Sequence, residues 1–214
     1  MDASSIATNP FFARFGDVKS VEDCQIIYDD WAKTYDTDLA SDAQNYVAPI
    51  LVTQTIASTN GNVDGLILDA GCGTGLVGVA LAQAGATTIH GLDLSPGMLE
   101  VAKRTGVYSH LATVDLSQPL KGITDGTYDI VACVGTFTAS HVGPVPALAE
   151  FVRVTKEGGL VVATVLDTLW ASDGYEAEVQ RLAAQNLVEV ISAEPMDYRK
   201  GAGVKARMAV MRKI

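Results

Sequence analysis

The hydrophobic pattern changes character at Gly65. From there to the end of the chain, short apolar runs alternate with stretches whose apolar positions recur every three or four residues. The first kind of segment is typical of buried strands and the second of amphipathic helices, so their alternation predicts a parallel sheet covered on both faces. The predicted strands are Leu66–Asp69, Thr88–Asp93, His110–Val114, Tyr128–Val134, Leu160–Val165, Val188–Ser192 and Lys205–Met211.

The stretches between these strands predict helices, and the link Ser117–Thr127 is short enough to hold only a turn. Ser95 followed by Pro96 is typical of a helix start, because serine caps the first turn and proline suits the first helical position. The last two strands are joined by the connection Glu194–Gly203 and predict an antiparallel pair. The predicted helices are Gly75–Ala84, Ser95–Thr105, Pro146–Val154 and Asp173–Gln185.

The amino-terminal part has a different pattern. Residues 1–19 carry three phenylalanines but no sustained period, and we expect a loose arm there. From Ser20 the apolar positions recur at helical spacing, which predicts an amphipathic helix with an aromatic stripe. A second helix is predicted over Pro49–Thr59, and residues 20–214 are predicted to form a single domain. The stripe consists of Val21, Cys24, Tyr28, Trp31 and Tyr35.

Composition narrows the class of protein. The chain has 214 residues, is 48% hydrophobic and carries a net charge of −10, which favours a globular domain and excludes a disordered chain. We expect no nucleic-acid partner, because no basic patch offsets this charge. No apolar run is long enough to span a membrane, and the polar amino end is unlike a secretory signal, so we expect a cytoplasmic protein without a membrane partner. Nothing in the sequence indicates an oligomeric state.

A glycine-rich turn directly follows the first predicted strand. Gly71, Gly73 and Gly75 lie between this strand and a helix, where glycine lets the backbone approach a ligand closely. Dinucleotide-binding enzymes also have glycines at such a turn, but they need a third glycine or small residue where this chain has Leu76. A nicotinamide-dependent oxidoreductase is therefore the disfavoured alternative.

Three successive strands end in or next to an aspartate. Asp69, Asp93 and Asp115 follow one another in this way, and the carboxyl ends of parallel strands meet at one edge of a sheet. A carboxylate there can accept hydrogen bonds from ribose hydroxyls or from an exocyclic amine. An isolated aspartate more often caps a turn. The combination with the glycine turn predicts one nucleoside pocket.

These motifs resemble those of class I S-adenosylmethionine-dependent methyltransferases, and the resemblance runs from about Ser20 to the carboxyl terminus. Its most specific segments are residues 68–75, 91–98 and 128–131, with residues 148–160 following. Residues 28–36, with the sequence YDDWAKTYD, further resemble the small methyltransferases grouped with the Williams-Beuren region methyltransferase-like protein.

The resemblance implies a Rossmann-like, doubly wound α/β fold with three layers and seven strands, the last strand antiparallel. It implies S-adenosylmethionine as cofactor and S-adenosylhomocysteine as product, with residues 20–60 forming a helical lid. Ordinary core packing is the alternative for Leu94 and Met98. The implied cofactor-binding residues are Tyr28, Trp31, Tyr35, Asp69, Gly71, Cys72, Gly73, Asp93, Leu94, Met98, Asp115, Leu116 and Val134.

Methyl transfer needs alignment and a dry site more than it needs an acid or a metal. The aromatic stripe can supply an electron-rich wall for such a site through cation–π contacts, or it can be core packing. His141 follows the fourth strand and is the candidate general base, the alternatives being a structural histidine or catalysis by proximity alone. Three widely spaced cysteines fit neither disulfides nor zinc ligation, so we expect reduced thiols and no metal.

Two functions follow from the sequence. The favoured one is an enzyme that transfers a methyl group from S-adenosylmethionine to a small molecule through an oxygen, nitrogen or sulfur nucleophile. The alternative is a protein that binds S-adenosylmethionine without transferring the methyl group and acts through a partner or steers another reaction. Turnover on a panel of acceptors separates the two.

Overall fold

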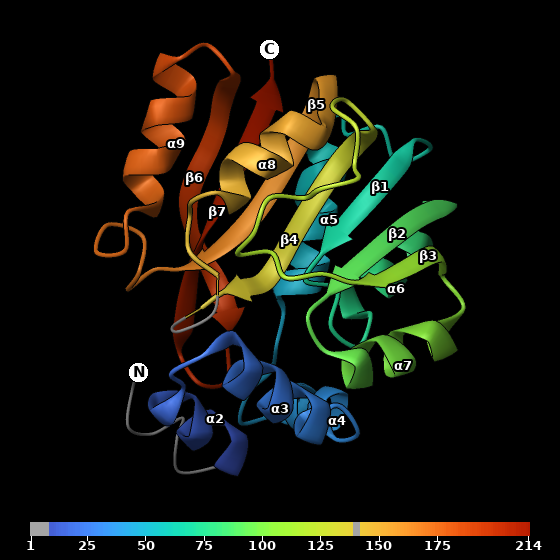
Figure 1. Cartoon of the computed structure of the whole chain (residues 1–214), viewed down its shortest axis with the longest axis vertical. Helices are drawn as coiled ribbons and strands as arrows, with labels where there is room; N and C mark the ends of the chain where they lie inside the picture. The colour runs from blue at the N-terminus through green and yellow to red at the C-terminus, as the bar shows by residue number, and fades with distance from the viewer. Residues whose placement is uncertain (1–8, 139–141) are drawn as a thin grey trace.

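The computed structural model describes residues 9–138 and 142–214. Within them, seven strands form one sheet in the order β3-β2-β1-β4-β5-β7-β6 (Figure 1). The first five strands run parallel, and β7 is antiparallel to both of its neighbours. The predicted doubly wound sheet with an antiparallel last strand is therefore confirmed. The strands are β1 Leu66–Ala70, β2 Thr88–Asp93, β3 Tyr108–Thr113, β4 Tyr128–Phe137, β5 Thr155–Leu166, β6 Val188–Arg199 and β7 Val204–Lys213.

Helices cover both faces of this sheet and one of its edges (Figure 1). Helices α8 and α9 lie on one face, α5 and α6 lie on the other, and α7 packs beside β2 and β3. None of the described helices is long and apolar enough to cross a membrane. The helices are α2 Pro10–Arg14, α3 Val21–Trp31, α4 Tyr35–Ala40, α5 Ala48–Ser58, α6 Leu76–Gln83, α7 Pro96–Thr105, α8 Ala147–Val154 and α9 Tyr175–Ala184, with the 3₁₀ turn η1 at Phe15–Asp17.

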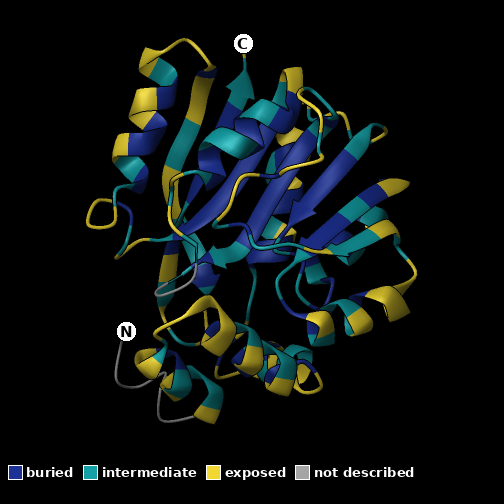
Figure 2. Cartoon of the chain, viewed as in Figure 1, coloured by how far each residue is buried: buried dark blue, intermediate teal, exposed yellow. Residues whose placement is uncertain are grey.

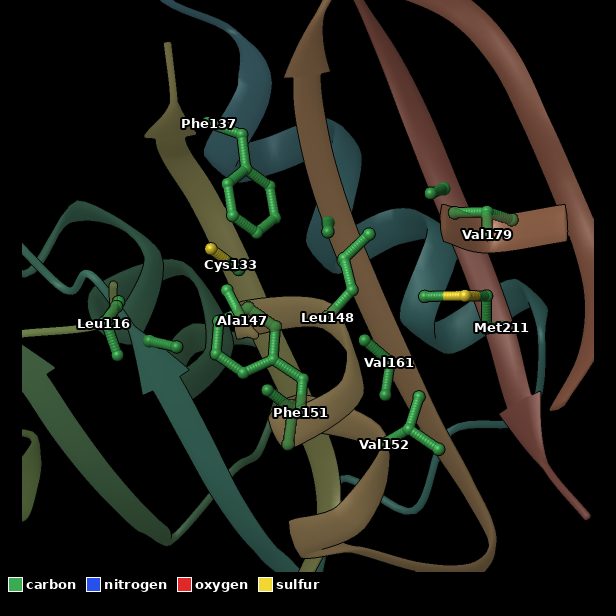
Figure 3. Packing of buried hydrophobic residues seen from close by; sticks show 14 of the residues in the cluster. Leu116, Cys133, Phe137, Ala147, Leu148, Phe151, Val152, Val161, Val179 and Met211 are labelled. Atoms are coloured by element: carbon green, nitrogen blue, oxygen red, sulfur yellow. The ribbon is translucent and has the colours of Figure 1, made fainter. Parts of the chain in front are cut away.

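Two hydrophobic clusters hold the layers together, one on each face of the sheet. The central strands are the most completely buried elements, because helices cover both of their faces (Figure 2). On the α8 face, Leu148 and Phe151 pack towards Cys133 of β4 and Val161 of β5 (Figure 3). This packing fixes the central strands, whose carboxyl ends carry the predicted site.

Strand β6 extends further than the sequence pattern predicts. The predicted strand ends at Ser192, but β6 continues to Arg199 and stays paired with β7 across the expected connection. Proline and glycine in this segment favoured a loop. Pro195 is tolerated because β6 is the edge strand of the sheet, where a missing N–H donor faces no neighbour. The extension carries Tyr198 and Arg199 to the edge where the parallel strands end.

The amino-terminal segment also differs from the expected loose arm. From Asn9 onward the chain forms α2 and η1, and the Asn9 side chain accepts a hydrogen bond from the N–H of Phe11 at 2.9 Å. The ring of Phe11 stacks on Trp31 of α3 at 5.2 Å. Aromatic contacts with another helix, rather than a period within the segment, therefore order it. Residues 1–8 lie outside the described part of the chain.

Candidate active site

Two adjoining cavities lie where the parallel strands end, between the sheet and the amino-terminal helices. The larger has a volume of about 520 Å³ and the smaller about 80 Å³. Both are lined by Tyr28, Tyr35 and Gly135. The predicted site residues that line the larger cavity are Tyr28, Tyr35, Gly71, Gly73, Asp93, Leu94, Met98, Asp115, Leu116 and Val134.

The glycine turn brings backbone to the wall of the larger cavity. Gly71 has a φ of 77° and Gly73 a φ of 54°, a region that side chains disfavour. A Cβ atom at Gly71 would lie 1.9 Å from Oγ1 of Thr136 on β4. The turn is tied to β2 because the N–H groups of Gly71 and Cys72 both donate to the carbonyl of Leu92, at 2.7 and 2.9 Å. Gly71 therefore leaves no room for a side chain, whereas a Cβ atom at Gly73 would have open space around it, and together they form a backbone cradle.

Asp93 connects this cradle to the next helix. Its Oδ2 accepts a hydrogen bond from the N–H of Gly73 at 2.7 Å, and its Oδ1 accepts one from the N–H of Ser95 at 2.9 Å. Burial raises the pKa of Asp93 to about 6, and these backbone hydrogen bonds oppose the increase. A carboxylate has further lone pairs, so Asp93 can still accept hydrogen bonds from a ligand in the larger cavity.

Asp69 lies outside the cavity lining, although its strand end is adjacent. It is fully buried, and its Oδ2 accepts a hydrogen bond from the hydroxyl of Tyr108 at 2.7 Å. Its Oδ1 has no hydrogen-bond partner among the described residues. Burial raises the pKa of Asp69 to about 7. Cys72, a buried free thiol behind the glycine turn, also lies outside the cavity lining. Neither the Asp69 nor the Cys72 side chain therefore forms part of the cavity wall.

Trp31 also lies away from the larger cavity. Its indole is 2% exposed, and Nε1 donates to Oδ2 of Asp38 at 2.7 Å. The rings of Phe12 and Tyr35 pack edge-on against it, at 5.1 and 4.7 Å between centroids. Trp31 reaches only the smaller cavity. The predicted single helix is wrong at its end, because α3 ends at Trp31 and Tyr35 begins α4. Trp31 belongs to the helical core, whereas Tyr28 and Tyr35 line both cavities.

Two aspartates that the sequence did not single out attach these helices to the sheet domain. Oδ1 of Asp29 accepts hydrogen bonds from the hydroxyl of Ser95 at 2.5 Å and from the N–H of Gly97 at 2.8 Å. Oδ1 of Asp36 accepts one from the hydroxyl of Thr74 at 2.5 Å. Asp29 lies at the amino end of α7, where the helix dipole favours an acid. The sequence does not reveal this contact, because Asp29 belongs to α3, far from α7 in the chain.

The described lining of the smaller cavity is mostly aromatic and includes one cation, Arg199. Tyr46 and Tyr198 meet edge to face at 5.1 Å, and a Cβ atom at Gly135 would lie 2.9 Å from the Tyr46 hydroxyl. Arg199 lines this cavity, with its guanidinium carbon 4.4 Å from the centroid of the Phe12 ring. Within the segment 194–203, Tyr198 and Arg199 line this cavity, and Met196 and Lys200 do not.

Comparison with known proteins identifies the family. A family model described as a methyltransferase domain matches residues 67–159, which span β1 to the start of β5. Methyltransferase-like protein 27 from Homo sapiens is 39% identical over 181 residues, which cover 82% of this chain and 72% of that protein. The chain belongs to the class I S-adenosylmethionine-dependent methyltransferases.

Solved structures of other methyltransferases share the fold. One is a putative S-adenosyl-L-methionine-dependent methyltransferase from Methanococcus maripaludis, with a TM-score of 0.62 and 18% identity over 86% of this chain and 93% of that one. Another is magnesium protoporphyrin IX methyltransferase from Synechocystis PCC 6803 with bound S-adenosylhomocysteine. Its TM-score is 0.58, with 18% identity over 99% of this chain and 98% of that one.

The larger cavity of this methyltransferase fits S-adenosylmethionine. Its volume lies within the range of about 300–1,000 Å³ that small-molecule sites have. The cradle at Gly71 has no room for a side chain, and Asp93 and Asp115 face the cavity from two strand ends. Lys19 is the single base among its described lining residues. Two carboxylates against one lysine suit a cofactor that carries a sulfonium and an ammonium group.

His141, the candidate general base of the methyltransferase, lies outside the described residues. The structure therefore does not test its role. Cys24 lines the larger cavity, and burial raises the pKa of its thiol to about 12, so it stays protonated at neutral pH. Among the described residues, no group of three or more His, Cys, Asp or Glu is placed to hold a metal ion.

Proposed function

We propose that this methyltransferase acts on a small molecule and methylates an oxygen, nitrogen or sulfur atom of it. The observation that carries the proposal is the smaller cavity, which adjoins the cofactor-sized cavity across Tyr28, Tyr35 and Gly135. At about 80 Å³ it has room for a small group and not for a polymer segment. The chain's net charge of −10 further disfavours a nucleic-acid substrate.

We assign the cofactor contacts from the residues that line the larger cavity. Gly71 and Gly73 would approach the methionine portion, and Asp93 would accept hydrogen bonds from the ribose hydroxyls. Leu94 and Met98 would sandwich the adenine, and Asp115 with the backbone of Leu116 would bind its edge. In this assignment Asp69 and Cys72 support the turn from behind instead of touching the ligand.

The bound cofactor supplies an electrophilic methyl group on a positively charged sulfur. The chain's contribution is alignment and exclusion of water, because the aromatic side chains of Tyr28, Tyr35 and Tyr46 surround the junction with the smaller cavity. A neutral acceptor must also lose a proton, and His141 is our candidate for its removal. We further propose that residues 20–60 act as a lid that closes over the cofactor.

The test is release of S-adenosylhomocysteine from S-adenosylmethionine with a panel of small acceptors, beside transfer RNA and denatured protein as polymer acceptors. We expect turnover with a small molecule and none with the polymers. Turnover on a polymer alone would refute the proposal. Tight cofactor binding without turnover on any acceptor would instead favour a binding protein that acts through a partner.

Calorimetry on an Asp93 variant tests the cofactor assignment. Asp93→Ala should weaken the binding of S-adenosylhomocysteine by about 1–3 kcal/mol, because the ribose hydroxyls lose their hydrogen-bond acceptor. Asp129→Ala is the matched control. The Asp129 carboxylate also accepts a backbone hydrogen bond, from the N–H of Leu66, and a side-chain one, from Lys156, but it lies away from the cavity. Equal affinities for the wild type and Asp93→Ala would remove Asp93 from the site.

A further inference from the structure

Arg199 occupies an unusual place for an arginine. It ends β6, its side chain is half-buried, and it lines the smaller cavity. Nη1 donates a hydrogen bond to Oε1 of Gln44 at 3.0 Å, and the guanidinium lies over the ring of Phe12 at 4.4 Å. Gln44 is itself buried, at 2% exposure. These contacts hold the guanidinium in position but leave most of its five N–H donors available.

No carboxylate pairs with Arg199 among the described residues. Arg153, Arg181 and Arg207 each form an ion pair with an acid, at 2.6 to 2.8 Å. Such acids are abundant in a chain with 25 Asp and Glu residues against 15 Lys and Arg. A half-buried charge without a counter-ion costs free energy, which a neutral amide and one aromatic face only partly offset.

The surroundings of Arg199 are consistent with this cost. Burial lowers the pKa of Arg199 below its ordinary value, and the nearby tyrosines 198, 35, 46 and 28 oppose the decrease. The described side chains beside it in the smaller cavity are aromatic or apolar, apart from their hydroxyl groups. Among the described lining residues, the charged side chain of this cavity is thus positive, whereas the cofactor cavity next to it has two aspartates against one lysine.

We propose that Arg199 binds a carboxylate of the acceptor, so that the substrate class is small carboxylic acids with an apolar or aromatic body. The proposal rests on the proposed function, because it assigns the smaller cavity to the acceptor. A guanidinium matches a carboxylate in shape and can form two parallel hydrogen bonds with it. The aromatic rings of Tyr46 and Tyr198 then pack against the body of the molecule.

The test compares benzoate with benzamide, which have the same shape and differ in charge. Binding of each is measured by calorimetry on the full chain saturated with S-adenosylhomocysteine, for wild type, Arg199→Gln and Lys200→Gln. Lys200 is the matched control, because it is the next residue, carries the same charge and is exposed. We expect the wild type and Lys200→Gln to bind benzoate at least about tenfold more tightly than benzamide, and Arg199→Gln to lose the difference.

Equal binding of benzoate and benzamide to the wild type, or no binding of either, would overturn the proposal. So would a preference for benzoate that survives in Arg199→Gln. The affinity of each variant for S-adenosylhomocysteine shows that it is folded. If Arg199→Gln fails that check, a crystal structure of the wild type with benzoate decides: density at the guanidinium supports the proposal, and density only elsewhere refutes it.

Failure of this proposal can be distinguished from failure of the proposed function. The experiment measures binding of benzoate and benzamide to the protein saturated with S-adenosylhomocysteine, so it needs no turnover. If the wild type shows no preference for benzoate but transfers methyl groups to an uncharged small molecule, the role of Arg199 alone is refuted. Turnover only on polymers would refute the proposed function, whatever the outcome with benzoate.

Discussion

The carboxylate of Asp29 should control how firmly the amino-terminal helices stay on the domain. Asp29→Ala removes two hydrogen bonds, from the Ser95 hydroxyl at 2.5 Å and from the Gly97 N–H at 2.8 Å. Both donors belong to the first turn of α7, where the helix dipole favours a negative charge. Because Ser95 is fully buried, its hydroxyl would lose its acceptor without gaining water.

The expected effect follows from these contacts. Hydrogen bonds to a charged group contribute about 1.5–3 kcal/mol each when buried, but Asp29 is half-exposed and water replaces part of its share. We therefore expect Asp29→Ala to reduce the free energy of docking by about 1–3 kcal/mol. This corresponds to an increase of about 5- to 150-fold in the population with α3 undocked.

Hydrogen exchange of residues 21–31 in the ligand-free protein measures this population. Asp29→Ala should accelerate exchange there by the stated factor and should also weaken S-adenosylhomocysteine, because Cys24 and Tyr28 of α3 line the cofactor cavity. Asp30→Ala is the control: Asp30 is the next residue on the same helix and pairs only with the partly exposed Arg14 at 2.8 Å, a pair worth at most about 1 kcal/mol.

Unchanged exchange in Asp29→Ala, or exchange equal to that of Asp30→Ala, would show that the Asp29 contacts do not hold the helix. If exchange of residues 21–31 in the wild type is also the same with and without S-adenosylhomocysteine, these residues are not a lid that the cofactor orders.

Three further predictions concern Gly71, Asp69 and His141. Gly71→Ala should lower the free energy of unfolding by at least about 2 kcal/mol in urea titrations, because the new Cβ meets Thr136 at positive φ; an unchanged midpoint would contradict the close approach. Burial raises the pKa of Asp69 from 3.8 to about 7, so between these values only the folded state holds the proton. The stability of the ligand-free protein should therefore fall as pH rises from about 4 to about 7 and level off above, by up to about 4 kcal/mol in all at 1.36 kcal/mol per pKa unit. Asp69→Asn should flatten this dependence, and an equally steep fall in the variant would assign it to other groups. His141→Gln should lower turnover by about 10²- to 10⁴-fold with little change in cofactor affinity, and an unaltered pH–rate profile would show that His141 is not the general base.

Local sequence patterns determined much of this protein. Strand and helix positions follow from hydrophobic period, and the turn at Gly71 and Gly73 follows from backbone angles that only glycine adopts readily. The convergence of Asp93 and Asp115 on one cavity follows from the order of the parallel strands. Each of these features depends on residues close in sequence or on the general rules of α/β sheets.

The tertiary structure alone decided which side chains reach a cavity. The sequence pattern predicts one helical stripe through Trp31 and Tyr35, but α3 ends at Trp31 and α4 begins at Tyr35. Trp31 is enclosed by Phe11 and Phe12 and does not line the cofactor cavity. Arg199 lies 155 residues from Gln44 in the sequence. The sequence pattern predicts a connection over Glu194–Gly203, whereas Arg199 is the last residue of β6. Such contacts join residues distant in the chain, and their geometry depends on how whole elements pack. The hydrophobic period of a single segment does not determine that packing.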